Sequence, residues 1–210
     1  MVIPIIPILK HPMYINKKSI MKKSILFSLA ISLLCSFSMN ETSWTQDKMH
    51  SQLNFSATHF GISHVEGRFQ SFTVNMKSEK ADFSDAQIEM TADIKSINTE
   101  VEFRDNDLRT SKWFDADKFS TLNFKSTSFT KIKGKVYKLK GFLTMHGITK
   151  EVAFDATFNG WAVTMTKKNT AGFTIKGKLL RSDYNLGNSA LLTGVSNEIL
   201  VWTNIEMGKN

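Results

Sequence analysis

The sequence contains little cysteine and little proline. Cys35 is the only cysteine among 210 residues, so the chain forms no internal disulfide. It lies in an N-terminal apolar stretch whose removal would leave no thiolate for a metal site or a nucleophile. The three prolines, Pro4, Pro7 and Pro12, interrupt the apolar residues at the start of the chain. Because proline blocks helix formation, this segment is not a membrane-spanning helix.

Residues 21–38 have the pattern of a secretory signal peptide. Lys22 and Lys23 form a positively charged head, and thirteen uncharged residues follow, from Ile25 to Phe37. Small residues at alternate positions, ending at Ser38, match the preference of signal peptidase. The segment is too short to span a bilayer comfortably, and the pattern therefore predicts export.

We expect residues 1–20 to be an upstream extension, Met21 to be the true start, and cleavage to follow Ser38. A retained amphipathic anchor is the alternative. A lipoprotein is disfavoured because Leu34, which precedes Cys35, is larger than lipoprotein processing usually accepts.

Removal of residues 1–38 changes the charge of the chain. The full sequence has 27 Lys and Arg residues, 19 Asp and Glu residues and a formal net charge of +8. Five lysines precede the expected cleavage site, which leaves a net charge of about +3. Phosphate binding needs a concentrated basic face, so we expect no nucleic-acid partner. The lysines that alternate around Gly134 indicate the solvated side of a hairpin.

Residues 39–210 are predicted to form one domain, which is long enough to bury a core without disulfides. Apolar and polar residues alternate along most of it, as they do from Gln87 to Lys95, which is typical of a strand with one buried face. Roughly eight strands with one or two short helices indicate an antiparallel sandwich or a closed barrel. The other alternating runs are 53–57, 72–76, 122–126, 137–143, 152–158, 171–179 and 199–205.

The alternation breaks at Asn98 and Thr99, whose side chains suit the start of a helix. A structureless loop of about twenty residues is uncommon in a compact domain, so residues 100–118 are predicted to include a short helix. This segment combines charged side chains with bulky apolar ones. They are Arg104, Asp105, Asp107 and Arg109, and Phe103, Leu108, Trp113 and Phe114.

Phenylalanine is abundant, with sixteen copies, and many lie on the predicted inward side of the strands. Aromatic rings and methionine suit the wall of an adaptable apolar cavity, and they also suit a packed core. Composition alone leaves both interpretations open. The inward set is Phe55, Phe69, Phe72, Phe124, Phe142, Phe154, Phe158 and Phe173.

The sequence offers no recognisable catalytic or metal-binding motif. No histidine pair has the spacing of a helical metal site and no carboxylate is placed to complete one, so we expect no metal. Neither a Gly-x-Ser-x-Gly turn nor a phosphate-binding glycine loop is present. The aspartate pairs 105/107 and 115/117 lie beside Arg or Lys, which favours their ionised state. We therefore expect no catalytic residue and no cofactor. The histidines after residue 38 are His50, His59, His64 and His146.

Five sequence blocks follow one another between Asp47 and Glu206. The first is His50-Ser51-x-Leu53-x-Phe55 with His59-Phe60-Gly61 and Val65-x-Gly67-x-Phe69. The others are Ser96-Ile97-x-Thr99 with Arg104-Asp105-x-x-Leu108-Arg109 and Trp113-Phe114-Asp115; Phe124-Lys125-Ser126; Gly141-x-Leu143-Thr144-x-His146-Gly147-x-Thr149; and Arg181-Ser182-Asp183-Tyr184-x-Leu186-Gly187. In this order they resemble the YceI-like family of lipid- and polyisoprenoid-binding proteins. Ser120 departs from the pattern, because the family usually has proline there.

The resemblance implies a lipocalin-like closed antiparallel β-barrel, secreted to the periplasm, with an isoprenoid chain in an apolar tunnel. The ligand would be an isoprenoid quinone or a polyprenyl phosphate, with transient contact with a membrane surface. No oligomeric state is predicted. The expected tunnel residues are Phe55, Phe69, Phe72, Met90, Ile94, Trp113, Phe114, Phe124, Phe142, Phe154, Phe158 and Phe173.

A head group would be selected by polar residues at the mouth of the tunnel. Arg104 and Arg109 have forked donors that suit a phosphate or a quinone oxygen. The favoured alternative is that Arg104 pairs with Asp105 or Asp183 and clamps the helix to the barrel. His59 and His146 complete the expected mouth, although a turn hydrogen bond is the simpler role for His146.

The sequence therefore predicts a periplasmic carrier for a long isoprenoid lipid. Two other functions remain open at this stage. One is an enzyme acting on a small apolar substrate at the mouth, with His146 or His59 as the base. The other is an exported structural or stress protein with a solid core.

Overall fold

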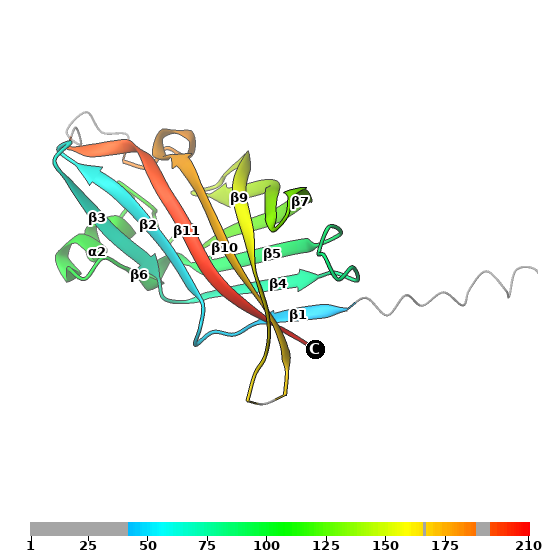
Figure 1. Cartoon of the computed structure of the whole chain (residues 1–210). Helices are drawn as coiled ribbons and strands as arrows, with labels where there is room; N and C mark the ends of the chain where they lie inside the picture. Colours follow the sequence, from blue (N-terminus) through cyan, green and yellow to red (C-terminus); the bar gives the residue numbers. More distant parts are fainter. Residues whose placement is uncertain (1–41, 166, 188–193) are drawn as a thin grey trace, which may run out of the picture. The chain divides into compact units, whose positions relative to one another are not determined.

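The computed structural model describes residues 42–165, 167–187 and 194–210 (Figure 1). The predicted upstream extension and signal peptide lie outside the described residues. The described strands belong to one compact unit, residues 41–210. They are β1 (Ser43–Gln46), β2 (Gln52–His59), β3 (Ser63–Phe69), β4 (Phe72–Lys77), β5 (Gln87–Asp93), β6 (Ile97–Asn98), β7 (Thr121–Lys133), β8 (Val136–Met145), β9 (Ile148–Val163), β10 (Asn169–Leu180) and β11 (Val195–Lys209). The helical elements are η2 (Ile94–Ser96), α2 (Glu102–Arg109) and η3 (Arg181–Tyr184).

The shortest strand of the ring, β1, closes the barrel. Trp44 lies opposite Met76 of β4 on one side and opposite Lys209 of β11 on the other. The ring runs β1-β4-β5-β7-β8-β9-β10-β11 and returns to β1, with every neighbouring pair antiparallel. Closure removes the unpaired edges of an open sheet. The predicted closed antiparallel β-barrel of about eight strands is confirmed.

Further strand pairing, between β11, β2, β3 and β6, extends the sheet beyond the closed ring. The last residues of β11 pair with β1, and residues 195–204 pair with β2. β3 continues from β2, and the two-residue strand β6 pairs with β3. α2 follows β6 and lies beside β3 and β6 (Figure 1). No helix among the described residues has the length and apolar character needed to cross a membrane.

All eight alternating runs found in the sequence are strands, namely β2, β4, β5 and β7 to β11. Their inward residues are buried or half-buried, and in β8 Tyr137, Leu139, Leu143 and Met145 are all buried. The lysine-rich run around Gly134 forms the β7–β8 hairpin, as predicted. These runs were recognisable because their alternation is long and regular.

The β8–β9 turn contains His146 and Gly147, both with positive φ, at 51° and 74°. Met145 pairs with Ile148 across it, so the loop has two residues. Two consecutive positive φ values match the turn whose twist suits a hairpin, and glycine adopts this region at little cost. His146 therefore lies in a turn, as the simpler role suggested for it by the sequence requires.

The helix does not start where the sequence indicated. Asn98 pairs in β6, and its side-chain oxygen accepts a hydrogen bond from the Glu100 N–H at 2.8 Å. Glu100 has a φ of 63°, which turns the chain before α2 starts at Glu102. The prediction of a cap at Asn98–Thr99 was wrong because Asn98 instead forms a local turn, an alternative that Asn side chains often adopt.

Aromatic side chains fill the barrel at one end of its core. The ring of Phe83, from the β4–β5 connection, is fully buried, with centroids at 5.3 Å from Trp44, 5.0 Å from Trp161 and 5.5 Å from Phe158. Phe173 of β10 lies 5.1 Å from Phe83. We call these five residues the aromatic plug. Its edge and tilted contacts are those that aromatic rings prefer.

Candidate functional site

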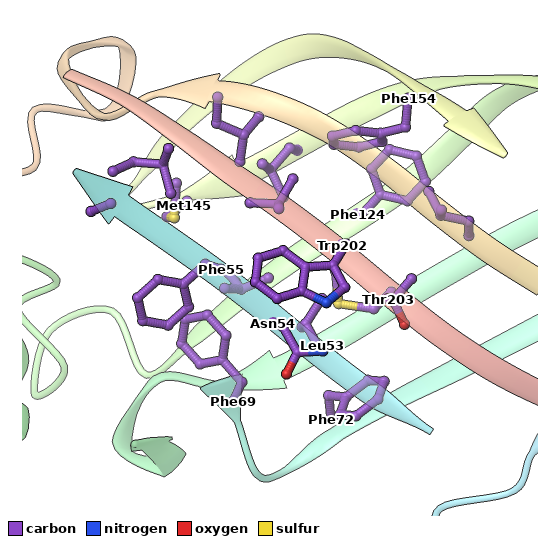
Figure 2. Close-up of a pocket in the computed structure, with 18 of the residues that line it drawn as sticks. Leu53, Asn54, Phe55, Phe69, Phe72, Phe124, Met145, Phe154, Trp202 and Thr203 are labelled. Carbon is purple, nitrogen blue, oxygen red and sulfur yellow. The ribbon is translucent and has the colours of Figure 1, made fainter. Parts of the chain in front are cut away.

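A cavity of about 460 Å³ occupies the interior of the barrel (Figure 2). This volume lies within the range of roughly 300–1,000 Å³ typical of ligand pockets. Most of the lining side chains are apolar and come from strands all around the barrel. Phe173 belongs to both the plug and the lining, so the plug forms the floor of the cavity.

Nine of the twelve predicted tunnel residues line this cavity. In Figure 2 Phe55 and Phe69 lie together on one side, and Phe124 and Phe154 lie together on another. Their ring centroids are 5.7 Å and 5.9 Å apart, respectively. The other predicted residues in the lining are Phe72, Met90, Trp113, Phe114 and Phe173.

Three predicted tunnel residues lie elsewhere. Phe142 is 49% exposed on the outer face, because Leu143 and Gly141 are the buried residues of that part of β8. Phe158 belongs to the aromatic plug, below the cavity. Ile94 is 1% exposed, but it lies in η2 and packs in the core instead of facing the cavity. Phe142 faces outward because of the phase of its strand, and Phe158 lies too far along the barrel. Ile94 misses the lining because β5 ends at Asp93 and Ile94 belongs to η2.

Gly67 of β3 makes room for the ring of Phe55. A Cβ at this position would lie 2.3 Å from the Phe55 ring and 2.8 Å from the methyl group of Thr99. The absence of a side chain at this position therefore lets Phe55 pack against the backbone of the neighbouring strand. Phe69, on the same strand, makes an edge contact with Phe114 at 6.0 Å.

The mouth of the cavity is framed by α2, and the helix is tied to the barrel through Thr99. The buried carboxylate of Asp105 accepts hydrogen bonds from the Thr99 N–H at 2.8 Å and from its hydroxyl at 2.5 Å. Arg104 donates from Nε to Thr99 Oγ1 and from Nη2 to Thr99 O, both at 2.7 Å. The clamp that the sequence suggested is present, but its partner is Thr99 in place of Asp105 or Asp183.

Arg181 of η3 is a second arginine in the cavity lining. Its guanidinium donates to the carbonyls of Leu186 at 2.8 Å and Gly187 at 2.7 Å, and to Ser196 O at 3.2 Å. It also lies 5.9 Å from the Trp113 ring, within the range of a cation–π contact. Both Arg181 and Trp113 line the cavity. The sequence showed Arg181 only as part of its last block and did not place it at the mouth.

The loop that follows α2 is hydrogen-bonded to the residues that follow η3. The Gly187 N–H donates to Lys112 O at 2.9 Å, and Trp113 Nε1 donates to Asp107 at 2.9 Å. A Cβ on Gly187, whose φ is 61°, would lie 2.5 Å from the Trp113 ring. Glycine is therefore required here both for backbone conformation and for space. These contacts fix the indole as part of the wall.

The four predicted mouth residues separate into two groups. His59 and Arg104 line the cavity, and His59 lies at the exposed tip of β2. Arg109 lies outside the lining, where it donates to Lys95 O at 3.0 Å and Ile97 O at 2.8 Å. His146 Nδ1 is hydrogen-bonded to Tyr184 O at 2.9 Å, which is the turn bond expected as its simpler role.

Several polar groups in the lining were missed by sequence reasoning. Asp107 was noted only as part of the charged cluster, and Thr203 gave no signal because threonine is common in strands. Thr203 Oγ1 is buried and has no hydrogen-bond partner among the described residues. A hydroxyl facing an apolar cavity can donate to or accept from a polar group on a ligand. The remaining polar lining residues are Asn54, Thr58 and Thr99.

Burial changes the pKa of a tyrosine in η3. Tyr184 is 1% exposed, and burial raises the pKa of its phenol to about 12. Its hydroxyl has no hydrogen-bond partner within the described part of the chain. The backbone carbonyl of the same residue is hydrogen-bonded to the His146 imidazole.

The chain matches the model of the YceI-like domain over residues 44–207. It is also similar to a UPF0312 protein of Staphylococcus aureus strain N315. The two are 36% identical over 155 residues, which cover 73% of this chain and 88% of that protein.

Solved structures have the same fold. The YceI protein of Campylobacter jejuni is 29% identical, with a TM-score of 0.64 over 73% of this chain and 90% of its own. BcnA of Burkholderia cenocepacia has a TM-score of 0.70 at 21% identity, covering 77% of this chain and 98% of its own. A polyisoprenoid binding domain from Saccharophagus degradans has a TM-score of 0.59 at 14% identity, covering 80% and 98%. The chain therefore belongs to the YceI-like family and has its lipocalin-like barrel fold.

Proposed function

We propose that this protein is a periplasmic carrier that holds the chain of an isoprenoid lipid, such as an isoprenoid quinone or a polyprenyl phosphate, inside its barrel. The observation that carries the proposal is the apolar cavity of about 460 Å³ enclosed by a closed β-barrel. The fold it shares with a polyisoprenoid binding domain supports the same ligand class.

Burial of hydrocarbon supplies the binding free energy in this proposal. Each CH₂ removed from water is worth about 0.8 kcal/mol, so a five-carbon unit contributes roughly 3–4 kcal/mol before costs. Ordering the chain and restricting its motion offset part of this gain. The aromatic rings and thioethers of the wall, such as those of Phe124 and Met145, pack against hydrocarbon and do not select a head group.

The head group lies at the mouth in this proposal. The guanidinium groups of Arg104 and Arg181 each donate to protein oxygens, which keeps them fixed near the entrance. Together with His59 they offer a positive and hydrogen-bonding rim to an oxygen-rich group. Arg109 takes no part, because its donors go to carbonyls outside the cavity lining.

The two other functions have less support. A solid-core structural protein does not agree with the cavity. An enzyme using His146 as base does not agree with the position of that side chain, which bonds to Tyr184 O and lies outside the lining. His59 lines the mouth, and its ring contacts Phe60 at 4.4 Å, so it is a rim residue in our proposal.

In this proposal the lipid enters the barrel while the protein is in contact with a membrane surface. Phe60 and Ile62, in the turn between β2 and β3, are 67% and 88% exposed beside the cavity residue His59. Apolar side chains at a loop tip can enter the boundary of a bilayer. We expect Ile62→Ser to slow lipid transfer from vesicles, whereas Val163→Ser, at the exposed end of β9, should leave the rate unchanged. Equal rates for both variants would contradict the loading route.

The carrier proposal is tested by what the protein retains. The exported form is purified without detergent, extracted with organic solvent, and the extract is examined by mass spectrometry. We expect one isoprenoid species in a reproducible ratio to protein. Protein that is empty in repeated preparations, and that also fails to take up a quinone or polyprenyl phosphate from vesicles, would contradict the proposal.

Export is a separate part of the proposal. The signal-like segment 21–38 predicts a mature chain that starts at Met39. Expression of the full sequence, osmotic release of the periplasm and N-terminal sequencing would test this. Retention of the protein in the cytoplasm with an intact N-terminus would contradict it while leaving lipid binding open.

A further inference from the structure

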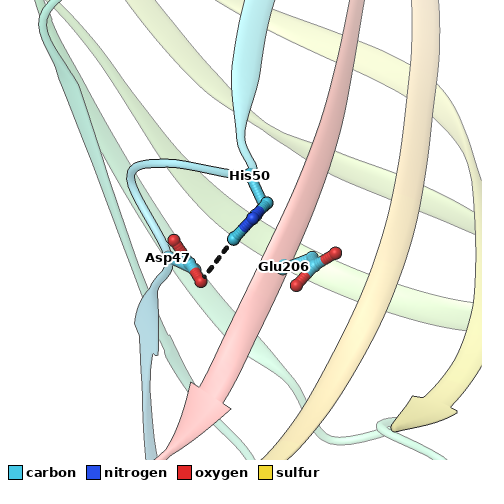
Figure 3. A group of neighbouring side chains, drawn as sticks. All are labelled: Asp47, His50 and Glu206. Carbon is cyan, nitrogen blue, oxygen red and sulfur yellow. Dashed lines mark hydrogen bonds and ion pairs between the residues drawn. The ribbon is translucent and has the colours of Figure 1, made fainter. Parts of the chain in front are cut away.

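Asp47, His50 and Glu206 meet on the outer surface of the barrel, away from the cavity lining (Figure 3). One potential ligand atom from each lies within 4.8 Å of the other two. Asp47 and His50 come from the corner between β1 and β2, and Glu206 comes from β11. Among the residues that the structure describes, no other group of three such side chains meets this criterion.

The backbone around these residues is held in place. The Asp47 N–H donates to Glu206 O at 2.8 Å, and the Glu206 N–H donates to Ser51 Oγ at 3.2 Å. The Met49 N–H donates to Asp47 Oδ1 at 2.9 Å, which shapes the corner. The three side chains therefore project from two segments that are fastened to each other. Sites built on fastened backbone hold their ligands more closely than sites on free loops.

The side chains carry complementary charge. His50 Nδ1 lies 2.8 Å from Asp47 Oδ2. Asp47 and His50 form a close pair, and Glu206 adds a second carboxylate beside the same imidazole. Among the described residues no salt bridge involves Glu206, so both carboxylates lie beside a single imidazole.

We propose that Asp47, His50 and Glu206 bind a divalent transition-metal ion of the Zn²⁺ class. One imidazole nitrogen and two carboxylate oxygens suit Zn²⁺ and similar ions, whereas Mg²⁺ and Ca²⁺ prefer oxygen alone. Ligand atoms about 2.1 Å from a tetrahedral ion lie about 3.4 Å apart. The present separations, from 2.8 Å up to 4.8 Å, bracket this value. The imidazole of His50 is 61% exposed and has room to adjust.

Metal binding at this place would connect the β1–β2 corner to β11 beside the seam where β1 closes the barrel. Three protein ligands leave at least one position for water, so the ion would exchange with solvent. An ion that binds only the folded chain raises the melting temperature, and the stabilisation grows with the logarithm of 1 plus the ratio of its concentration to Kd. A rise in melting temperature on addition of the ion would therefore measure stabilisation of the seam.

The test uses ZnCl₂ with the full mature chain, free of affinity tags and treated with a chelator. Isothermal titration calorimetry should show one Zn²⁺ ion per chain. Glu206→Gln and His50→Gln should each weaken binding at least about tenfold, because each removes a direct ligand. Glu198→Gln on the same strand and His64→Gln on β3 are the matched controls and should bind as the parent does.

Two further readouts keep the result interpretable. Zn²⁺ should raise the melting temperature of the parent protein and of both controls, but not that of Glu206→Gln, whose metal-free melting should match the parent. Co²⁺ should give visible absorption in the parent protein that changes in His50→Gln. Absence of saturable Zn²⁺ binding by the parent, or equal affinity in the ligand variants and the controls, would overturn the proposal.

Discussion

The carboxylate of Asp105 accepts both the N–H and the hydroxyl of Thr99, at 2.8 Å and 2.5 Å. Asp105 lies in α2, and Thr99 directly follows β6. Two hydrogen bonds to one buried carboxylate, joined by the contacts of Arg104 to the same threonine, fix the helix that frames the cavity mouth. The mouth is therefore a rigid structure built from charged side chains.

Removing this carboxylate should destabilise the fold. Asp105→Ala leaves a buried N–H without a partner, and we expect the free energy of unfolding to fall by about 3 kcal/mol. Asp105→Asn keeps an oxygen that accepts a hydrogen bond, so its free energy of unfolding should fall by less. Urea unfolding measures both. Asp117→Ala, which breaks an exposed pair with Lys95, should leave the stability nearly unchanged. Equal losses for Asp105→Ala and Asp117→Ala would contradict this role.

Glycine at position 187 is predicted to be essential to the mouth. Gly187→Ala places a methyl group 2.5 Å from the Trp113 ring at a φ of 61°. Gly134→Ala has a similar φ of 55° with no atom within 4 Å, so it isolates the backbone strain. We expect Gly187→Ala to be less stable than Gly134→Ala by about 1–3 kcal/mol in urea unfolding and to shift the tryptophan emission. An equal fall in the free energy of unfolding for both variants would show that the Trp113 side chain moves aside to make room for the methyl group.

Filling the cavity should abolish lipid retention without unfolding the barrel. Ala57 of β2 lines the cavity, and Ala57→Trp would occupy space that the ligand needs. Ala153→Trp on the exposed face of β9 adds the same ring to the outside. We expect at least a tenfold loss of co-purified lipid for Ala57→Trp alone, measured by mass spectrometry against protein. Undiminished lipid in Ala57→Trp would place the binding site outside the barrel.

The buried phenol of Tyr184 predicts a loss of stability at high pH. The pKa is about 12 in the folded protein, against about 10 in the unfolded chain. Between these values the unfolded chain binds fewer protons, so the free energy of unfolding falls as pH rises, by at most about 1.4 kcal/mol per pH unit. Below pH 10 the effect vanishes. Urea unfolding of Tyr184→Phe from pH 7 to 11 should show a smaller decline than the parent.

The matched control for this prediction is Tyr137. Its hydroxyl donates to Asp82 O at 2.7 Å, whereas the Tyr184 hydroxyl has no partner among the described residues. At pH 7, Tyr137→Phe should therefore lower the stability by about 1 kcal/mol, and Tyr184→Phe should leave it equal or higher. A loss at pH 7 for Tyr184→Phe would reveal a hydrogen bond to solvent.

Most of the barrel wall could be predicted from the sequence because the signal is local. A strand with one buried face must alternate, and runs such as 87–95 and 152–158 do so without interruption. The tunnel residues were largely found in the same way. Phe142 was misplaced because it is out of phase with Tyr137, Leu139 and Leu143, whose side chains face inward on the same strand.

Closure could not be predicted in this way. β1 is four residues long, and its sequence, Ser-Trp-Thr-Gln, has too few positions to show a period. Its identity as a strand depends on backbone partners in β4 and β11 that are distant in sequence. The same holds for the mouth, where Arg181 meets Trp113 only after the barrel has formed.

The sequence by itself determined a β-rich chain with inward aromatic residues and a recognisable family pattern. Both features could be read because alternation and short motifs depend only on residues that are close together in the chain. Only the tertiary structure decided that the rings leave a cavity above a packed plug, since cavity volume depends on how distant side chains meet. It also decided that Glu206 joins Asp47 and His50, although about 160 residues separate them in the chain. Proximity of this kind arises from strand pairing and closure, which no local pattern encodes.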